Sequence, residues 1–353
     1  MNEIMLREIQ DQPAALERAS VDLRRQVREL DLGPPPRKVI LTGSGDSIIA
    51  GTALESLYRR SLAAEVRAIS SMESSRYEPF DQETLVVAVS VSGGVARTVE
   101  AVLRARAQGA RALAVVARPG SRLAEAAGAE LLMPEPLARH TPHSRDYTQT
   151  LLALAILLER LAATRFEQLD RWPEATRDVL DRAFAELPGW VDDSPQTIFL
   201  GAGPDRATAR YGALKFWEGG AMRAIWDELE EFAHGSQLMA APGQSAVLIA
   251  GKEAHGRAEE FLAGLARMEI SARLVIDQPP RSPERFVVPD LGGAAWMPLV
   301  SCLPLQVLTY LTVQRRGIDL SIEMGGVPYG RLYGEMHVQW TKHSTIDADP
   351  NPG

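Results

Sequence analysis

Short apolar runs alternate with helix-like stretches along most of this 353-residue chain. After Arg37 the runs read KVILTG, EVRAIS, TLVVAVS, ALAVVA and AELLMP, and the stretches between them have the apolar spacing of helices. Strands that are apolar on both faces are typical of a parallel sheet that helices cover on each side. We therefore expect a doubly wound α/β domain in this part of the chain.

The same pattern begins again at QTIFLGAG, residues 196–203. A helix is expected over 205–218, strands near SAVLIAG and ARLVID, and an apolar helix over 302–315. The similarity of VILTGSG to IFLGAG, each opening a domain, indicates an internal duplication. The predicted fold class is α/β, with two doubly wound parallel-sheet domains, each a three-layer sandwich of the flavodoxin-like or Rossmann-like kind.

The length also favours two domains, at roughly 150 residues per domain. We expect an N-terminal helical segment at 1–35, a first domain at 36–165, a second at 166–330 and a tail at 331–353. Pro13 is expected to break the N-terminal segment into two helices, because proline removes a backbone donor. The tail, rich in Gly, Tyr, His and Pro, is expected to be solvated.

Composition and charge exclude several classes of protein. The formal net charge of −8 argues against a nucleic-acid partner, although a local basic pocket can still bind phosphate. No stretch approaches the roughly 18 apolar residues of a membrane span, and the acidic N-terminus lacks a signal-peptide core. The lone Cys302 lies in an apolar run, which predicts a buried thiol, no disulfide and a cytoplasmic location.

A serine- and glycine-rich loop, SVSGG, separates the predicted strand TLVVAVS from the next helix. Parallel α/β sheets bind ligands at the carboxyl ends of their strands, and a helix N-terminus attracts anions. Ser90 and Ser92 would supply hydroxyls to a phosphate, and Gly93 and Gly94 would let the backbone approach it. The alternative is that these residues form an ordinary strand-to-helix turn, which would have a similar sequence.

A possible proton-transfer site lies in RYGALKFWEGGAMRAIWDELEEFAHG, residues 210–235. Lys215 and Glu218 are three residues apart and therefore share one face of a helix. His234 follows after a predicted strand, so chain reversal can return its imidazole toward the carboxylate. The alternative is a solvated ion pair and an unrelated loop histidine.

This stretch resembles the sugar isomerase (SIS) family, as in the isomerase half of glucosamine-6-phosphate synthase, with its patterns EGALKLKE and ELKHG. The resemblance runs from about Ile4 to about Gly317. It implies that Glu218 moves a proton between two sugar carbons, that His234 opens the sugar ring and that Lys215 assists. It also implies a homodimer in which each chain lends its histidine to the partner's site.

The resemblance adds further ligand contacts. The loop TGSGDS matches the family's CGTS-type loop, which makes Ser47, Ser44 and Asp46 sugar or phosphate contacts. We expect Asp46, as a carboxylate, to cap the helix or bind a sugar hydroxyl rather than phosphate. SRDYTQT matches the start of the domain-crossing helix and adds Ser144 and Arg145.

Several positions depart from the family pattern. Tyr211 stands where the synthase has glutamate, and Val95 stands where a phosphate-binding hydroxyl is usual, unless Thr98 replaces it. The family's C-terminal lysine over the sugar has no match, which leaves Arg331 or Lys342. Nothing in this sequence matches the family's glutamine-hydrolysing half, so glutamine-dependent synthesis is not expected of this chain alone.

These inferences predict an aldose–ketose isomerase for a hexose or amino-sugar 6-phosphate. Deamination of an amino-sugar 6-phosphate, or deglycation of a fructosamine 6-phosphate, uses the same proton transfer and stays open. A non-catalytic sugar-phosphate sensor is the alternative of another class. No cofactor or metal is implied, because His140 and His143 have no third ligand nearby in sequence and are expected to be polar loop residues.

Overall fold

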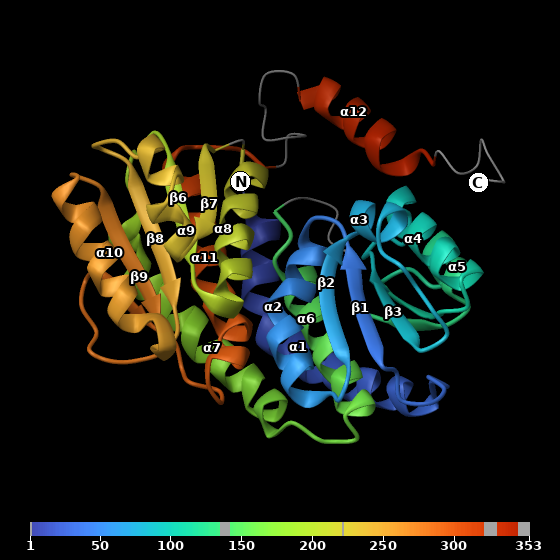
Figure 1. The fold of residues 1–353 in the computed structure, drawn as a ribbon. Coiled ribbons are helices and arrows are strands. Elements are labelled where there is room, and N and C mark those ends of the chain that lie inside the picture. Colours follow the sequence, from blue (N-terminus) through green and yellow to red (C-terminus); the bar gives the residue numbers. More distant parts are fainter. Residues whose placement is uncertain (1, 135–141, 221, 321–329, 345–353) are drawn as a thin grey trace. The chain divides into compact units, whose positions relative to one another are not determined.

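The computed structural model describes residues 2–134, 142–220, 222–320 and 330–344 (Figure 1). The chain divides into two compact units, and each is built from more than one segment. The first-sheet unit comprises residues 15–137, 146–166 and 331–353. The second-sheet unit comprises residues 1–14, 138–145 and 167–330.

The first-sheet unit contains five parallel strands in the order β2-β1-β3-β4-β5. The strands are β1 (Lys38–Gly43), β2 (Glu65–Ser70), β3 (Thr84–Val89), β4 (Arg111–Val116) and β5 (Glu130–Leu132). The helices are α2 (Asp46–Ser61), α3 (Ser71–Arg76), α4 (Ala96–Ala107), α5 (Arg122–Ala127) and α6 (Arg145–Leu161). All six residues of the central strand β3 are buried, which is why the sequence shows no alternation there.

The second-sheet unit repeats this arrangement, with parallel strands in the order β10-β9-β8-β6-β7. The strands are β6 (Thr197–Gly201), β7 (Ala224–Glu228), β8 (Ser245–Ala250), β9 (Ser271–Ile276) and β10 (Arg285–Val287). The helices are α7 (Glu167–Glu186), α8 (Arg206–Glu218), α9 (Leu229–Ala233), α10 (His255–Arg267) and α11 (Pro298–Arg315). The prediction of two doubly wound parallel sheets is confirmed.

In each sheet the first strand lies between the second and the third, so the strand order reverses at the first strand. The loops after the first and third strands open at that reversal, which is where open α/β sheets bind ligands. The two first loops share a backbone feature: Gly45 and Gly203 both have φ of +56°. The duplication expected from VILTGSG and IFLGAG is therefore visible in the backbone as well.

The N-terminal segment differs from expectation. It forms one helix, α1 (Glu3–Glu29), that continues through Pro13. Proline cannot donate to the carbonyl of Ile9, four residues earlier, but the Gln12 side-chain amide donates to that carbonyl at 3.0 Å instead. The expected break is therefore wrong, because a side chain satisfies the acceptor that proline leaves open.

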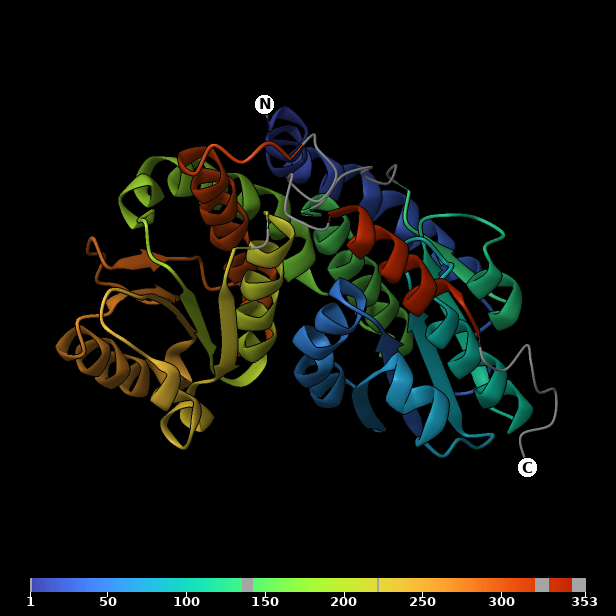
Figure 2. The same cartoon turned by 90° about the horizontal axis from the view of Figure 1, so that it is seen from above.

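The C-terminal segment also differs from expectation. The described part forms a helix that was not expected, α12 (Gly330–Lys342), followed by two residues that contact the first-sheet unit. Much of α12 is nevertheless exposed, as expected of a solvated tail. Figures 1 and 2 show α12 beyond the end of the first sheet toward which its strands point. No local sequence pattern indicated this packing, because the partners of this segment lie about 250 residues earlier.

Two further expectations concern single features. Cys302 is buried in α11, and burial raises the pKa of its thiol, as expected of an inert cysteine. None of the helices in the described ranges is both long enough and apolar enough to cross a membrane.

Candidate active site

The SVSGG loop follows β3 at the carboxyl edge of the first sheet, directly before α4. Ser90 is buried, and its hydroxyl has no hydrogen-bond partner among the described residues. The same is true of the hydroxyls of Thr42, at the end of β1, and Thr98, in the first turn of α4. Buried hydroxyls are nearly always hydrogen-bonded, so three that lack partners at one edge indicate bound water or a polar ligand.

The two glycines of this loop have different roles. Gly93 has φ of +64°, and a Cβ there would overlap the Ser121 side chain, so only glycine fits. Its amide donates to the Ser90 carbonyl oxygen at 2.8 Å. The Gly94 amide makes only a long contact of 3.4 Å with Ser92 Oγ. Gly94 therefore offers an amide to an anion more readily than Gly93 does.

The TGSGDS loop after β1 lies beside β3, because β1 and β3 are neighbours in the sheet. Ser44 Oγ lies 2.5 Å from Ser71 Oγ, and Ser47 is buried in the first turn of α2. Gly45, not Asp46, is the N-cap of α2, and no side chain caps it. The capping role expected of Asp46 is therefore wrong, because the positive φ of Gly45 places Asp46 already inside the helix.

Lys215 and Glu218 lie on α8 in the second-sheet unit. Lys215 is almost completely buried, and its Nζ donates to Glu218 Oε2 at 2.6 Å and to the His143 carbonyl oxygen at 3.2 Å. The Glu218 side chain remains partly exposed. A buried ammonium favours the ionised carboxylate, which is the form that accepts a proton.

A chain of buried polar groups extends from this pair. The Tyr211 hydroxyl donates to the His143 carbonyl oxygen at 3.3 Å and accepts from Gln306 Nε2 at 3.1 Å. Gln306 Oε1 in turn accepts from Gln12 Nε2 at 2.7 Å. Tyr211 stands where the family has glutamate. Its hydroxyl therefore links the glutamines of α1 and α11 to the His143 carbonyl oxygen, which also accepts from Lys215. No sequence signal identified this network, because its members are up to 294 residues apart.

Ser144 and Arg145 lie at the start of α6. Arg145 Nη1 pairs with Asp11 Oδ2 at 3.1 Å, so this guanidinium already has a carboxylate partner. The Ser144 hydroxyl is buried and makes no hydrogen bond within the part of the chain that the structure describes. His140 lies outside the described residues, and His143 contributes its backbone carbonyl to the Lys215 site.

His234 caps the C-terminal end of α9. Its imidazole is 69% exposed, and Nε2 lies 3.4 Å from Glu230 Oε1, so its partner in the described structure is Glu230 and not Glu218. Arg257, and to a lesser extent His234, holds the pKa of Glu230 below its usual range. The histidine is thus presented on the surface of the second-sheet unit.

The second-sheet unit also contains a buried carboxyl that the sequence did not reveal. Asp205 follows β6, and its Oδ1 accepts from Thr208 at 2.9 Å and from Ser301 at 2.5 Å. Burial is the main reason that the pKa of Asp205 is raised to about 7. A buried carboxyl in the loop after β6 offers an anion no hydroxyl group of the kind that Ser44 and Ser47 provide after β1.

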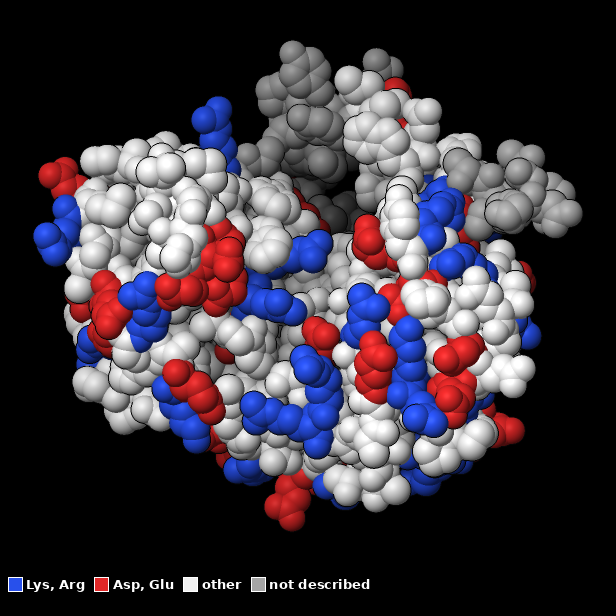
Figure 3. Space-filling model, viewed as in Figure 1, with Lys and Arg blue, Asp and Glu red and all other residues white. Residues whose placement is uncertain are grey.

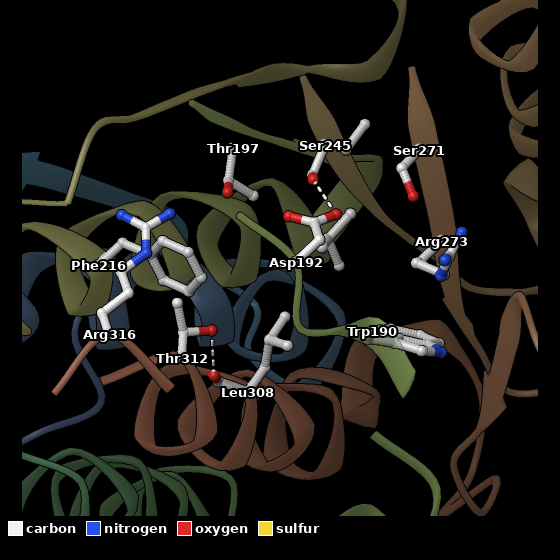
Figure 4. Close-up of a pocket in the computed structure, with 12 residues that line it drawn as sticks. Trp190, Asp192, Thr197, Phe216, Ser245, Ser271, Arg273, Leu308, Thr312 and Arg316 are labelled. Atoms are coloured by element: carbon white, nitrogen blue, oxygen red, sulfur yellow. Dashed lines mark hydrogen bonds between the residues drawn. The ribbon is translucent and has the colours of Figure 1, made fainter. Parts of the chain in front are cut away.

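An enclosed pocket lies at the opposite, amino-terminal edge of the second sheet (Figure 4). Thr197, Ser245 and Ser271 stand at the starts of β6, β8 and β9, and Asp192 accepts from Ser245 Oγ at 2.5 Å. The pocket has a free volume of about 20 Å³, which holds little more than a water molecule. This pocket is too small for a sugar.

The predicted residues therefore form two groups. Those expected to contact the phosphate or the sugar lie in the first-sheet unit: Ser44, Asp46, Ser47, Ser90, Ser92, Gly93, Gly94 and Thr98. Those expected to move protons, together with Ser144 and Arg145, lie in the second-sheet unit: Lys215, Glu218 and His234. Lys215 and Glu218 are in contact, and His234 is not in contact with either.

The first-sheet unit combines a doubly wound parallel sheet with two serine-containing loops at the carboxyl edge of its strands. Residues 22–160 match the family model described as SIS domain. This part of the chain is a SIS domain, and the second sheet repeats its strand order.

Relatives extend the likeness to nearly the whole chain. Glutamine–fructose-6-phosphate aminotransferase (isomerizing) of Thermococcus kodakarensis is 30% identical over 344 residues, which are 89% of this chain and 56% of that protein. The chain thus spans about half the length of the curated relatives it matches.

Solved structures show the same fold at lower identity. Glucosamine-6-phosphate deaminase from Thermotoga maritima superposes with a TM-score of 0.76 at 16% identity, covering 90% of this chain and 96% of that one. Tagatose-6-phosphate ketose/aldose isomerase from Escherichia coli gives 0.75 at 18% identity, covering 92% of this chain and 95% of that one. These likenesses show the fold alone.

Proposed function

We propose that this protein isomerises a hexose or amino-sugar 6-phosphate between its aldose and ketose forms. Glu218 abstracts a proton from the carbon beside the carbonyl and returns it to the neighbouring carbon, through an enediol or enolamine. His234 assists ring opening, and Lys215 positions Glu218. The phosphate is bound by Ser90, Ser92 and Gly94, with Ser47 and Ser44 nearby.

The observation that carries this proposal is the Lys215–Glu218 contact of 2.6 Å. An ammonium with almost no exposure costs free energy unless it is paired and hydrogen-bonded. Here Glu218 and the His143 carbonyl satisfy it, which fixes the carboxylate on a partly exposed surface. In an ordinary ion pair on the surface, the lysine would remain exposed to solvent, whereas Lys215 is buried.

The exposure of His234 supports a second part of the proposal. An imidazole that pairs with Glu230 rather than Glu218 does not complete the site of its own chain. We propose that the protein forms a homodimer in which His234 acts in the partner's site.

The test is hydrogen exchange in deuterated water. Fructose 6-phosphate and glucosamine 6-phosphate are incubated with the wild-type protein and with Glu218→Gln, and label at C1 and C2 is followed by NMR. Wild type should incorporate label into at least one of them, and Glu218→Gln should do so roughly 10²- to 10⁴-fold more slowly. Glu253→Gln, which removes an exposed glutamate in the short helical turn after β8, serves as the control.

The products distinguish the related reactions. Release of ammonia from glucosamine 6-phosphate with the same label pattern would assign deamination, and release of an amine from a fructosamine 6-phosphate would assign deglycation. Exchange at the wild-type rate in Glu218→Gln would remove Glu218 as the base. Binding of every sugar phosphate without exchange would favour the sensor.

A further inference from the structure

The C-terminal helix brings a lysine onto the SVSGG loop. Lys342 Nζ lies 3.4 Å from Ser92 Oγ and 3.5 Å from the position that a Cβ on Gly94 would take. The ammonium therefore faces the residues whose hydroxyl and amide are open to an anion. Figure 3 shows Lys and Arg side chains gathered at the end of α4 near α12.

Two contacts fix the position of this lysine. Arg97 Nη2 donates to the His343 carbonyl oxygen at 2.6 Å, and Ser344 Oγ donates to Glu100 Oε1 at 2.6 Å. Glu100 is itself buried in α4 and pairs with Arg97 at 2.8 Å and with Arg76 at 2.7 Å. The residues directly after Lys342 are thus bound to the helix that begins at the phosphate loop.

A second cation lies on a loop that is hydrogen-bonded to the SVSGG loop. Arg118 follows β4, in a loop whose Ala117 amide donates to the Val91 carbonyl oxygen at 3.0 Å. Within residues 2–134, 142–220, 222–320 and 330–344, neither Arg118 nor Lys342 has a carboxylate partner. Burial, and then the charge of Arg118, lowers the pKa of Lys342. Two cations that repel each other at one loop are stabilised when an anion lies between them.

We propose that Lys342 and Arg118 bind the phosphate of the ligand together with Ser92 and Gly94, and replace the hydroxyl that Val95 does not provide. The inference rests on the proposed function, because it assigns two further ligands to the same phosphate loop. Two cations match the two charges of a phosphate monoester better than one hydroxyl does. The ligand class is therefore a dianionic sugar phosphate, and unphosphorylated sugars are excluded.

Affinity measurements test the assignment. Calorimetric Kd values for fructose 6-phosphate, glucosamine 6-phosphate and inorganic phosphate are compared among wild type, Lys342→Met, Arg118→Gln and the double variant. Each single variant should bind the sugar phosphate about tenfold or more weakly, because a charge-assisted hydrogen bond is lost. Lys252→Met, which removes an exposed lysine after β8, should bind as wild type does.

Acylation of lysines gives a readout that needs no activity. The lysines of the chain are Lys38, Lys215, Lys252 and Lys342. Limited acetylation followed by mass spectrometry should modify Lys342 readily, and inorganic phosphate or sugar phosphate should protect it. Lys252 should react equally with and without the anion, which controls for changes in reagent strength.

The outcomes separate this inference from the function on which it rests. If wild type binds and exchanges a sugar phosphate but both variants bind it equally well, Lys342 and Arg118 are not ligands and the function stands. If no sugar phosphate binds but inorganic phosphate binds through both cations, the anion site stands and the function fails. If no anion protects Lys342, the inference is overturned.

Discussion

The two sheets of this protein have the same strand order but different chemistry at the same edge. After the first strand, the first sheet continues with Ser44 and Ser47, and the second with Pro204 and the buried Asp205. After the third strand, the first sheet has SVSGG and the second has a short helical turn, Lys252–Ala254. The second sheet instead has the pair proposed to transfer protons, Lys215 and Glu218, in the last turn of α8. In the proposed function, the first sheet binds the phosphate and the second transfers the proton, so one fold serves two kinds of site.

The largest expected effect concerns the residues of the second sheet and combines two variants. In a homodimer with shared sites, Glu218→Gln and His234→Ala each disable both sites, but a hybrid dimer restores one site with both groups intact. Random pairing makes half of the dimers hybrids, so mixing should recover about a quarter of wild-type activity. Turnover of the mixture is compared with each parent after denaturation and joint refolding. No recovery in hybrids verified by mass would show that His234 does not serve the partner.

The buried Asp205 provides a second test, because its environment has no equivalent in the described part of the first sheet. Its pKa is raised to about 7 from an ordinary 3.8, so the folded state holds a proton that the unfolded chain releases. This stabilisation is fully present below pH 4 and is lost as the pH rises through 7. Asp205→Asn keeps the acceptor and removes the titration. Relative to wild type, its free energy of unfolding should rise by up to about 4 kcal/mol between pH 4 and pH 8.

Denaturant unfolding at four pH values measures this difference. Asp193→Asn is the control, because Arg315 holds the pKa of exposed Asp193 below its usual range and the expected trend has the opposite sign. If the free energy of unfolding changed with pH by the same amount in wild type and Asp205→Asn, the pKa of Asp205 would not be raised in the folded protein.

The sequence predicted those features that depend on neighbouring residues. Apolar runs identified the strands because both faces of a central strand such as β3 are buried, and Lys215 and Glu218 were paired because three residues bring side chains together on a helix. It did not predict contacts between distant segments. Gln12 reaches Gln306 across 294 residues and Lys342 reaches Ser92 across 250, and no local pattern encodes either contact.

A third test concerns the backbone of the SVSGG loop. Gly93→Ala would place a Cβ in the left-handed region and in overlap with the Ser121 side chain, so strain and overlap should together cost roughly 2–4 kcal/mol. Gly120→Ala has a similar φ of +60° but nothing within 4 Å, so it should cost only about 1 kcal/mol. Thermal unfolding compares the two variants. Equal losses would show that Ser121 moves away without cost.

The smallest expected effect comes from substituting one glycine in the first loop of each sheet, which compares the two sheets directly. Gly45 and Gly203 occupy equivalent loops, have the same φ of +56°, and have no atom within 4 Å of the position that a Cβ would take. Alanine at either position is strained by the positive φ, and at Gly45, where ψ is −131°, the cost should exceed the roughly 1 kcal/mol of the left-handed helical region. Only Gly45 lies beside Ser44 and Ser47, where a methyl group would narrow the approach of a ligand to the backbone. Gly45→Ala should weaken calorimetric binding of fructose 6-phosphate several-fold, and Gly203→Ala should leave it unchanged. Equal affinities in the two variants would mean that the loop after β1 does not contact the ligand.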